Sequence, residues 1–332
     1  MTIESPAVLG HLSSWLTSPE LCAIRAASRN LHAAIPRHTW ELTASNISNA
    51  EAMGRLAKVF PHVWCLRLQD AILEEMPTMQ AIVPWLNRGW KLRELIFTRV
   101  TCISGFYVHL LAEELKKVTI RQCYQVQQPA IVAPNLEVLV IEHCPVSKFH
   151  AGTSLPQLKK LALSSRSLSA LRARHLIKNT LPRSPALEVL SLAGCLQLEQ
   201  VLVDPGDLPA LRKLDLSSCA KLTRVHVSSK LLETLDLSRN DELQFVLLDL
   251  ERAVDLDLSF LKNLTHLYIR SPSLRRLNLR GCDQLRRNAT SVHCPNLQFV
   301  VLQGTSLEVD DLNTSEVNDE VLALPASAEQ QR

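Results

Sequence analysis

The apolar positions of the chain follow a short unit, L-x-x-L-x-L, that occurs eleven times. In residues 211–231, Leu214 and Leu216 alternate across Asp215 as one face of a β-strand does, and Leu211 precedes them. Successive units start 21 to 29 residues apart. A unit this short buries its apolar face only against its neighbours, so the pattern predicts a solenoid. The units begin at Val63, Leu92, Leu115, Leu136, Leu158, Leu187, Leu211, Leu232, Ala253, Leu274 and Leu297.

Eight positions after the start of a unit, the chain often carries a cysteine or an asparagine. These residues are Cys123, Cys144, Cys195, Cys219, Asn240 and Cys282. Together with the leucines they resemble the leucine-rich repeat over residues 63–307. The resemblance implies an α/β solenoid with a parallel β-sheet on its concave face, and a ladder of inward residues that bond the backbone. Other turns should be bonded differently, because this position holds Ala71, Val100, Arg166, Leu261 and Thr305.

The second half of several units also alternates. Apolar residues with period-2 spacing, many of them β-branched, predict short extended segments on the opposite face. The sets are Leu198/Val201/Val203, Leu222/Val225/Val227, Leu243/Val246/Leu248 and Leu264/Leu267/Ile269. The two longest units predict helical inserts on the convex side, one over residues 167–180 and one over residues 74–86, which Pro77 and Pro84 would interrupt.

The segment in front of the units predicts helices. Ser18 is a suitable N-cap and Pro19 a suitable first residue for a helix that Pro36 ends. An extended lead-in should begin at Trp40, and another helix should cover residues 49–60. The segment is similar to the F-box in its proline, its first-helix leucines and its closing tryptophan, although Ala27-Ser28 replaces the family's Val-Cys and Leu31 its tryptophan.

The F-box resemblance implies a function. It makes the chain the substrate-recognition subunit of a Skp–cullin–F-box ubiquitin ligase, with the repeats binding a protein substrate and the Skp adaptor recruiting the cullin. The implied adaptor-binding residues are Pro6, Leu9, Leu12, Leu16, Leu21 and Ile24. A plain helical cap on the first coil explains the same segment, and the chain would then be a leucine-rich-repeat scaffold or inhibitor without a ubiquitin role.

This interpretation divides the chain into four parts. Residues 1–45 form the F-box-like helical module, residues 46–62 a helical lead-in, and residues 63–307 the solenoid. Residues 308–332 form a terminal cap and an acidic tail that we expect to fray.

Residues between the inward leucines should face a partner. Asp215, Asp236 and Asp257 fall on consecutive strands and predict an acidic stripe that attracts a cationic partner or has raised pKa values. Further substrate-binding candidates are Asn278, Arg280 and Arg121. The same aspartates are also explained as residues that only solvate the strands. The basic residues of the convex insert predict a solvated helix face or, alternatively, a phosphate or nucleic-acid contact: Arg172, Arg174, His175, Lys178 and Arg183.

Composition narrows the class of protein. The 36 Lys+Arg and 33 Asp+Glu leave a net charge of +3, too near neutral to indicate a polyanion such as nucleic acid as partner. No apolar run reaches the ~18–20 residues of a membrane span. Nine cysteines, an odd number of which five occupy ladder positions, favour a reducing compartment, cytoplasm or nucleus, over a disulfide scaffold. A metal or redox role for the two His-Cys-Pro segments stays open. No catalytic or cofactor motif occurs, so we expect neither enzyme activity nor a cofactor.

Overall fold

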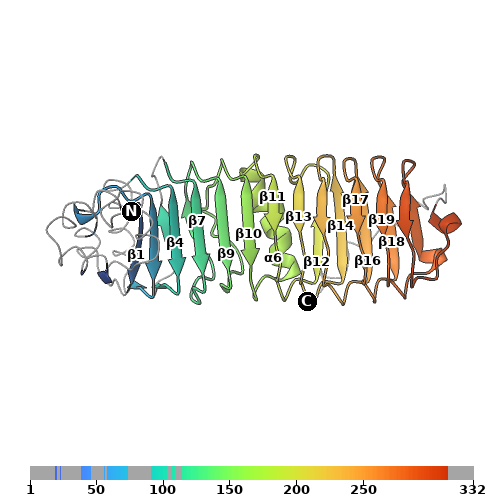
Figure 1. Cartoon of the computed structure of the whole chain (residues 1–332), viewed down its shortest axis with the longest axis horizontal. Coiled ribbons are helices and arrows are strands. Elements are labelled where there is room, and N and C mark those ends of the chain that lie inside the picture. Colours follow the sequence, from blue (N-terminus) through green and yellow to red (C-terminus); the bar gives the residue numbers. More distant parts are fainter. Residues whose placement is uncertain are drawn as a thin grey trace, which may run out of the picture.

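The computed structural model describes residues 19–20, 23, 39–45, 56, 58–73, 91–102, 107–109 and 114–312. The described coils stack into a straight, elongated solenoid of parallel strands (Figure 1). The fold is therefore the α/β solenoid of leucine-rich-repeat type that the sequence predicts. Among these residues, no helix combines the length and the hydropathy needed to cross a bilayer.

One side of the solenoid, which we call the first wall, is built from the L-x-x-L-x-L segments. A nine-stranded sheet continues into a three-stranded one, and each of the eleven predicted units supplies one strand. β1 pairs in register with β2, so the wall begins at Glu41, before the first unit. The strands are β1 Glu41–Ser45, β2 Cys65–Gln69, β4 Glu94–Thr98, β7 Lys117–Arg121, β9 Val138–Glu142, β10 Lys160–Ser164, β11 Val189–Ser191, β13 Lys213–Asp215, β15 Thr234–Asp236, β17 Asp255–Asp257, β19 Arg276–Asn278 and β21 Phe299–Val301.

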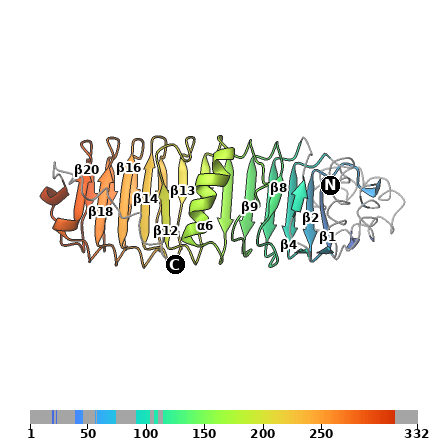
Figure 2. The same cartoon turned by 180° about the vertical axis from the view of Figure 1, so that it is seen from behind.

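The opposite side, the second wall, confirms the strands predicted in the second halves of the units (Figure 2). A five-stranded sheet covers the C-terminal coils, and two short pairs, β3–β5 and β6–β8, cover the N-terminal ones. The inward valines and leucines of both walls form one aliphatic core. The strands are β3 Ile72–Leu73, β5 Thr101–Cys102, β6 Tyr107–His109, β8 Ala130–Val132, β12 Gln200–Val203, β14 Arg224–Ser229, β16 Phe245–Leu250, β18 His266–Arg270 and β20 Thr290–His293.

A helical insert interrupts the second wall between β8 and β12 (Figure 2). It comprises α6 (Ala170–His175), a π-helical turn η1 (Leu176–Thr180) and a 3₁₀ turn η2 (Leu181–Arg183), which confirms the helix predicted over residues 167–180. The insert buries Ala173, Leu176, Ile177 and Leu181 against the core. Two further 3₁₀ turns, η3 (Arg287–Ala289) and η4 (Val309–Leu312), lie near the C-terminal end.

The N-terminal predictions are only partly covered by described residues. Pro19, Glu20 and Ala23 are helical, as predicted for the second helix of this segment. Residues 56, 58 and 59 are helical as well, and the Phe60 amide donates to the Leu56 carbonyl at 2.8 Å. The predicted insert over residues 74–86 lies outside the described residues.

A left-handed residue ends the first-wall segment in ten of the eleven repeat units. Seven positions after the coil's first residue, φ lies between 51° and 83°. The amide of this residue donates to a carbonyl of the next coil, as Ser218 does to the Ser238 carbonyl at 3.0 Å. The exceptions are Gly304 in the terminal coil and Arg239, which follows β15 where the nine-stranded sheet ends. The left-handed residues are Asp70, Arg99, Gln122, His143, Gly194, Ser218, Arg239, Phe260, Gly281 and Gly304.

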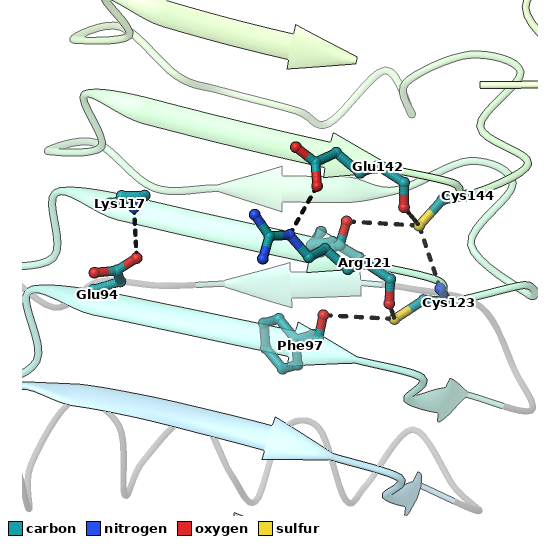
Figure 3. Close-up of polar contacts among 8 residues, drawn as sticks. Glu94, Phe97, Lys117, Arg121, Cys123, Glu142 and Cys144 are labelled. Atoms are coloured by element: carbon teal, nitrogen blue, oxygen red, sulfur yellow. Dashed lines mark hydrogen bonds and ion pairs between the residues drawn. The ribbon is translucent and has the colours of Figure 1, made fainter. Parts of the chain in front are cut away.

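The left-handed turn directs the next side chain inward, and this produces the predicted ladder. Each ladder side chain donates to a carbonyl at the end of the preceding coil's strand (Figure 3). Cys195 bonds Leu163 at 3.3 Å and Cys282 bonds Leu258 at 3.1 Å. Asn240 donates from Nδ2 to the Leu216 carbonyl of the preceding coil at 2.9 Å, and it makes two further bonds: Nδ2 donates to the Leu237 carbonyl of its own coil at 2.9 Å, and Oδ1 accepts from the Cys219 amide at 2.8 Å.

The coil that starts at Leu158 departs from this pattern. Its seventh following residue, Ser165, is not left-handed, and Arg166 at the ladder position is exposed. The buried Ser165 hydroxyl instead donates to the Val146 carbonyl at 2.6 Å. The remaining units without Cys or Asn behave in two ways. Thr305 bonds Leu302 within its own turn, and the apolar residues Ala71, Val100 and Leu261 simply pack in the core.

We predict that Asn240→Ala lowers the free energy of unfolding by about 2–4 kcal/mol, because it strands a buried amide and two buried carbonyls. Asn263→Ala is the matched control, since the exposed Asn263 side chain donates one bond, to the Asp241 carbonyl at 2.8 Å. It should cost less than ~1 kcal/mol. Urea unfolding followed by circular dichroism measures both; equal losses would contradict the structural role of the ladder.

A second prediction concerns pH. Burial raises the pKa of the Cys219 thiol from 9.0 to about 11. The unfolded thiol therefore ionises first, so the stability that the protonated thiol contributes is complete below about pH 9 and lost as the pH approaches about 11. The loss should reach roughly 2–3 kcal/mol. Because lysines titrate in the same range, the measurement is the difference in pH slope between wild type and Cys219→Ala. Parallel pH slopes of the free energy of unfolding for the two proteins would contradict this contribution of the Cys219 thiol.

Candidate interaction surface

The predicted substrate-binding residues gather on the outer face of the first wall, toward its C-terminal end. Asp215 and Asp236 are register partners on β13 and β15, and Asp257 follows on β17. Asn278 on β19 is the register partner of Asp257. These four side chains form one row across adjacent coils, as the repeat spacing predicts.

Arg121 stands apart from that row, on β7. Its Nε lies 2.8 Å from the Glu142 carboxylate on the next strand (Figure 3). Similar pairs join Lys117 to Glu94 at 2.7 Å and Arg67 to Glu41 at 2.9 Å. The charges of Arg121 and its neighbours are thus balanced within the wall.

The charged side chains at the edge of the first wall are paired in the same way. Glu137 lies 2.9 Å from both Lys116 and Lys159, and hydrogen bonds from these lysines hold the pKa of its carboxyl below the ordinary value. At the left-handed turns, Arg99 donates two hydrogen bonds to Asp70, at 2.6 and 2.8 Å, and lowers the pKa of that carboxyl to about 2. Exposed pairs of this kind add little stability individually, but they leave no uncompensated charge for a partner.

The three aspartates of the row differ from these residues, because none forms an ion pair with any residue that the structure describes. Each caps the turn that follows it. Asp236 Oδ1 accepts the Ser238 amide at 2.9 Å, and Asp257 Oδ1 accepts the Ser259 amide at 2.9 Å. The Oδ2 atoms of Asp236 and Asp257 accept no hydrogen bond from described residues. Asp215 is more fully bonded: it also accepts the hydroxyls of Ser217 and Ser191, at 2.7 and 2.9 Å.

Asn278 shows that this cap does not require a charge. Its Oδ1 accepts the Arg280 amide at 3.1 Å, in the geometry that the aspartates use. The Arg280 guanidinium lies over the Phe260 ring, 5.8 Å from its centre, rather than against a carboxylate. Beyond it, Phe299 and Val301 on β21 expose 66% and 44% of their surface, so an apolar edge adjoins the acidic row.

The central positions of the middle first-wall strands are more apolar. The central residues Ile96, Val140 and Ala162 are half-buried among their neighbours, and Thr119 between them is buried. This apolar row shares its strands with the charge pairs Lys117–Glu94 and Arg121–Glu142.

A second surface, which the sequence analysis did not predict, lies on the outer face of the second wall. Leu202, His226, Leu247 and Tyr268 form a row in register across four strands. The Phe245 ring lies 5.7 Å from Tyr268 beside this row. Burial raises the pKa of Tyr268 and lowers the pKa of His226. The sequence signal for this surface is the set of aromatic residues placed between the inward positions of these strands.

The adaptor-binding candidates Pro6, Leu9, Leu12, Leu16, Leu21 and Ile24 lie outside the described residues. Seven cysteines of the described ranges, all except Cys102 of β5, are buried thiols without disulfides. Cys144 and Cys294, the cysteines of the two His-Cys-Pro segments, are among them, and no group of three or more His, Cys, Asp or Glu in the described ranges is arranged to hold a metal ion.

Fold and surface together define a repeat-type scaffold built from coils of leucine-rich-repeat type. No family model matches the chain. It is similar to the disease resistance protein RPS4B of Arabidopsis thaliana, with 26% identity over 203 residues. The match covers 54% of this chain, which spans 17% of the length of that protein.

Proposed function

We propose that the chain is a non-catalytic recognition scaffold that binds a basic segment of a protein partner along Asp215, Asp236 and Asp257. The absence of an ion pair from all three, among the residues described, carries this proposal. Elsewhere on the first wall, acidic side chains such as Glu94 and Glu142 face a cation on the adjacent coil.

The spacing of the row supports an extended partner. Adjacent strands lie ~4.8 Å apart, so the carboxylates repel one another, and a chain of cations along the row removes that repulsion. The second oxygens of Asp236 and Asp257 are available to accept charge-assisted hydrogen bonds from lysine or arginine. Asn278 caps the equivalent turn of its own coil without a charge, so folding alone does not require three aspartates.

The stripe is tested with Asp215→Asn, Asp236→Asn and Asp257→Asn in one full-length chain. Asparagine keeps an oxygen to cap each turn, so the fold should persist while affinity for a captured partner falls at least ~10-fold. A matched control removes three charges from exposed turns outside the wall: Glu199→Gln, Asp241→Asn and Glu242→Gln. Biosensor titration compares the two. Unchanged affinity in the stripe variant, or equal loss in the control, would reject the stripe as the docking site.

We further propose that the scaffold is the substrate-recognition subunit of a Skp–cullin–F-box ubiquitin ligase. The F-box-like residues in front of the solenoid support this, and so does their position directly before the repeats. Such a subunit needs no chemistry of its own, because tethering raises the effective concentration of the substrate at the transfer site. A second candidate is a scaffold in disease resistance without a ubiquitin role, which the similarity to RPS4B favours.

A co-purification experiment separates the two candidates. Under the ligase proposal, the full chain recovers a Skp adaptor and a cullin, and Leu9→Glu with Leu12→Glu abolishes the recovery. Truncations should begin at Thr39, because removal of residues 1–45 would also delete β1. The Asp215/Asp236/Asp257 variant is the control, and it should keep the adaptor. Recovery of a stripe-dependent partner without adaptor or cullin would favour the scaffold and reject the ligase role.

A further inference from the structure

A hollow of about 450 Å³ lies on the second wall, beside the helical insert. It forms where the bulky insert meets the thinner neighbouring coil. α6, η1 and η2 supply His175, Asn179 and Arg183, the loop after β9 supplies Lys148 and His150, and Gln128 comes from the loop before β8. The hollow thus joins three successive coils and is separate from the acidic row of the first wall.

The lining of this hollow is cationic. Lysine, arginine and two histidines contribute to it, together with amide and hydroxyl side chains, and none of its ten residues is acidic. The sequence around it has the same bias. Between Glu142 and Glu188 the chain carries eight Lys+Arg and no aspartate or glutamate. Two of these basic residues face acids, Lys159 with Glu137 and Lys178 with Asp204 and Asp207, and neither lines the hollow.

Several donors of the hollow are not engaged elsewhere. The side chains of Lys148, His175, Asn179 and Gln128 make no hydrogen bond or ion pair with the part of the chain that the structure describes. Arg183 uses one Nη1–H to bind the Ala151 carbonyl at 2.9 Å, which fixes the loop and leaves the rest of the guanidinium fork for a ligand.

The donor state of His150 follows from its own loop. Its Nδ1 accepts the Gly152 amide at 3.1 Å, so the ring proton resides on Nε2, which can donate. The loop that carries it is anchored to the neighbouring coil: the His150 amide donates to the Pro129 carbonyl at 3.0 Å, and the buried Thr153 hydroxyl donates to the same carbonyl at 3.3 Å. The loop that carries Lys148 and His150 is therefore held in place before a ligand arrives.

We propose that this hollow binds a phosphorylated small molecule. Guanidinium, ammonium and imidazole donors without an acidic neighbour match a phosphate group. The volume falls in the range of small-molecule pockets, roughly 300–1,000 Å³, and exceeds what one orthophosphate fills. A confined hollow suits a compact ligand better than a polynucleotide, which would need a continuous basic track. This site goes beyond the recognition function proposed for the first wall.

Isothermal titration of the full chain at fixed ionic strength tests the site, with fructose 1,6-bisphosphate, orthophosphate and a single-stranded 20-nucleotide RNA as probes. Saturable binding of the bisphosphate, tighter than that of orthophosphate, is expected. Lys148→Gln with His175→Gln should weaken it at least ~10-fold, because both side chains are free donors in the hollow. Lys160→Gln with Arg174→Gln is the control outside the lining and should change affinity less than ~2-fold.

Three results would overturn the proposal. Absence of saturable bisphosphate binding removes the site. Equal weakening by the pocket variant and the control shows that charge alone attracts the anion, and equal affinity for orthophosphate makes the free ion the ligand. RNA binding that is tighter and depends on Arg174 would replace the pocket with an open polyanion surface. Because the tested residues lie far from the acidic row, none of these outcomes bears on partner binding by the first wall.

Discussion

The left-handed residue at the end of each first-wall segment is the constraint on which the solenoid depends. It costs ~1–2 kcal/mol wherever the residue is not glycine, as at Gln122, Ser218 and Phe260. Two sets of bonds offset this cost: the amide of the left-handed residue donates to the next coil, and the ladder side chain behind it donates to the preceding one. A coil that has both bonds, such as the one with Ser218 and Cys219, is therefore bonded to both neighbours at the point where its backbone is most strained, and such coils should fold as a coupled array.

The coil that starts at Leu158 shows what happens where this device is absent. Ser165 replaces the left-handed turn, Arg166 points outward, and the chain continues into the helical insert instead of a second-wall strand. The insert still closes the core through Leu176 and Ile177, but it breaks the uniform thickness of the second wall. The cationic hollow lies at that break. Departures from local regularity are where function is expected in a repetitive fold.

Period-2 alternation was sufficient to predict the first-wall strands of the eleven units and the second-wall strands β12, β14, β16 and β18, because inward residues such as Leu214 and Val225 pack on equivalent residues in adjacent coils. The second-wall strands β3, β5, β6, β8 and β20 were not predicted. The same register placed the acidic row correctly. β1 was not predicted as a full coil, since Leu42 and Ala44 lack the preceding leucine of the unit. The left-handed position was missed because mostly ordinary residues occupy it; Gly194, Gly281 and Gly304 were its only signal. The hollow could not be predicted, because it brings Gln128, Lys148 and Arg183 together from separate coils.

Whole-chain charge is a poor guide to the partners of such a molecule. A net charge of +3 suggested no strongly charged ligand, yet the solenoid separates its charges in space. Each side chain stays on its own coil and wall, so charges neutralise only across adjacent strands, as Arg67 and Glu41 do. The C-terminal part of the first wall keeps a row of aspartates, while the hollow on the second wall is lined by cations without acids. Two ligands of opposite charge can therefore bind the same rigid body, and the potential that each encounters is set by its local surface rather than by the sum.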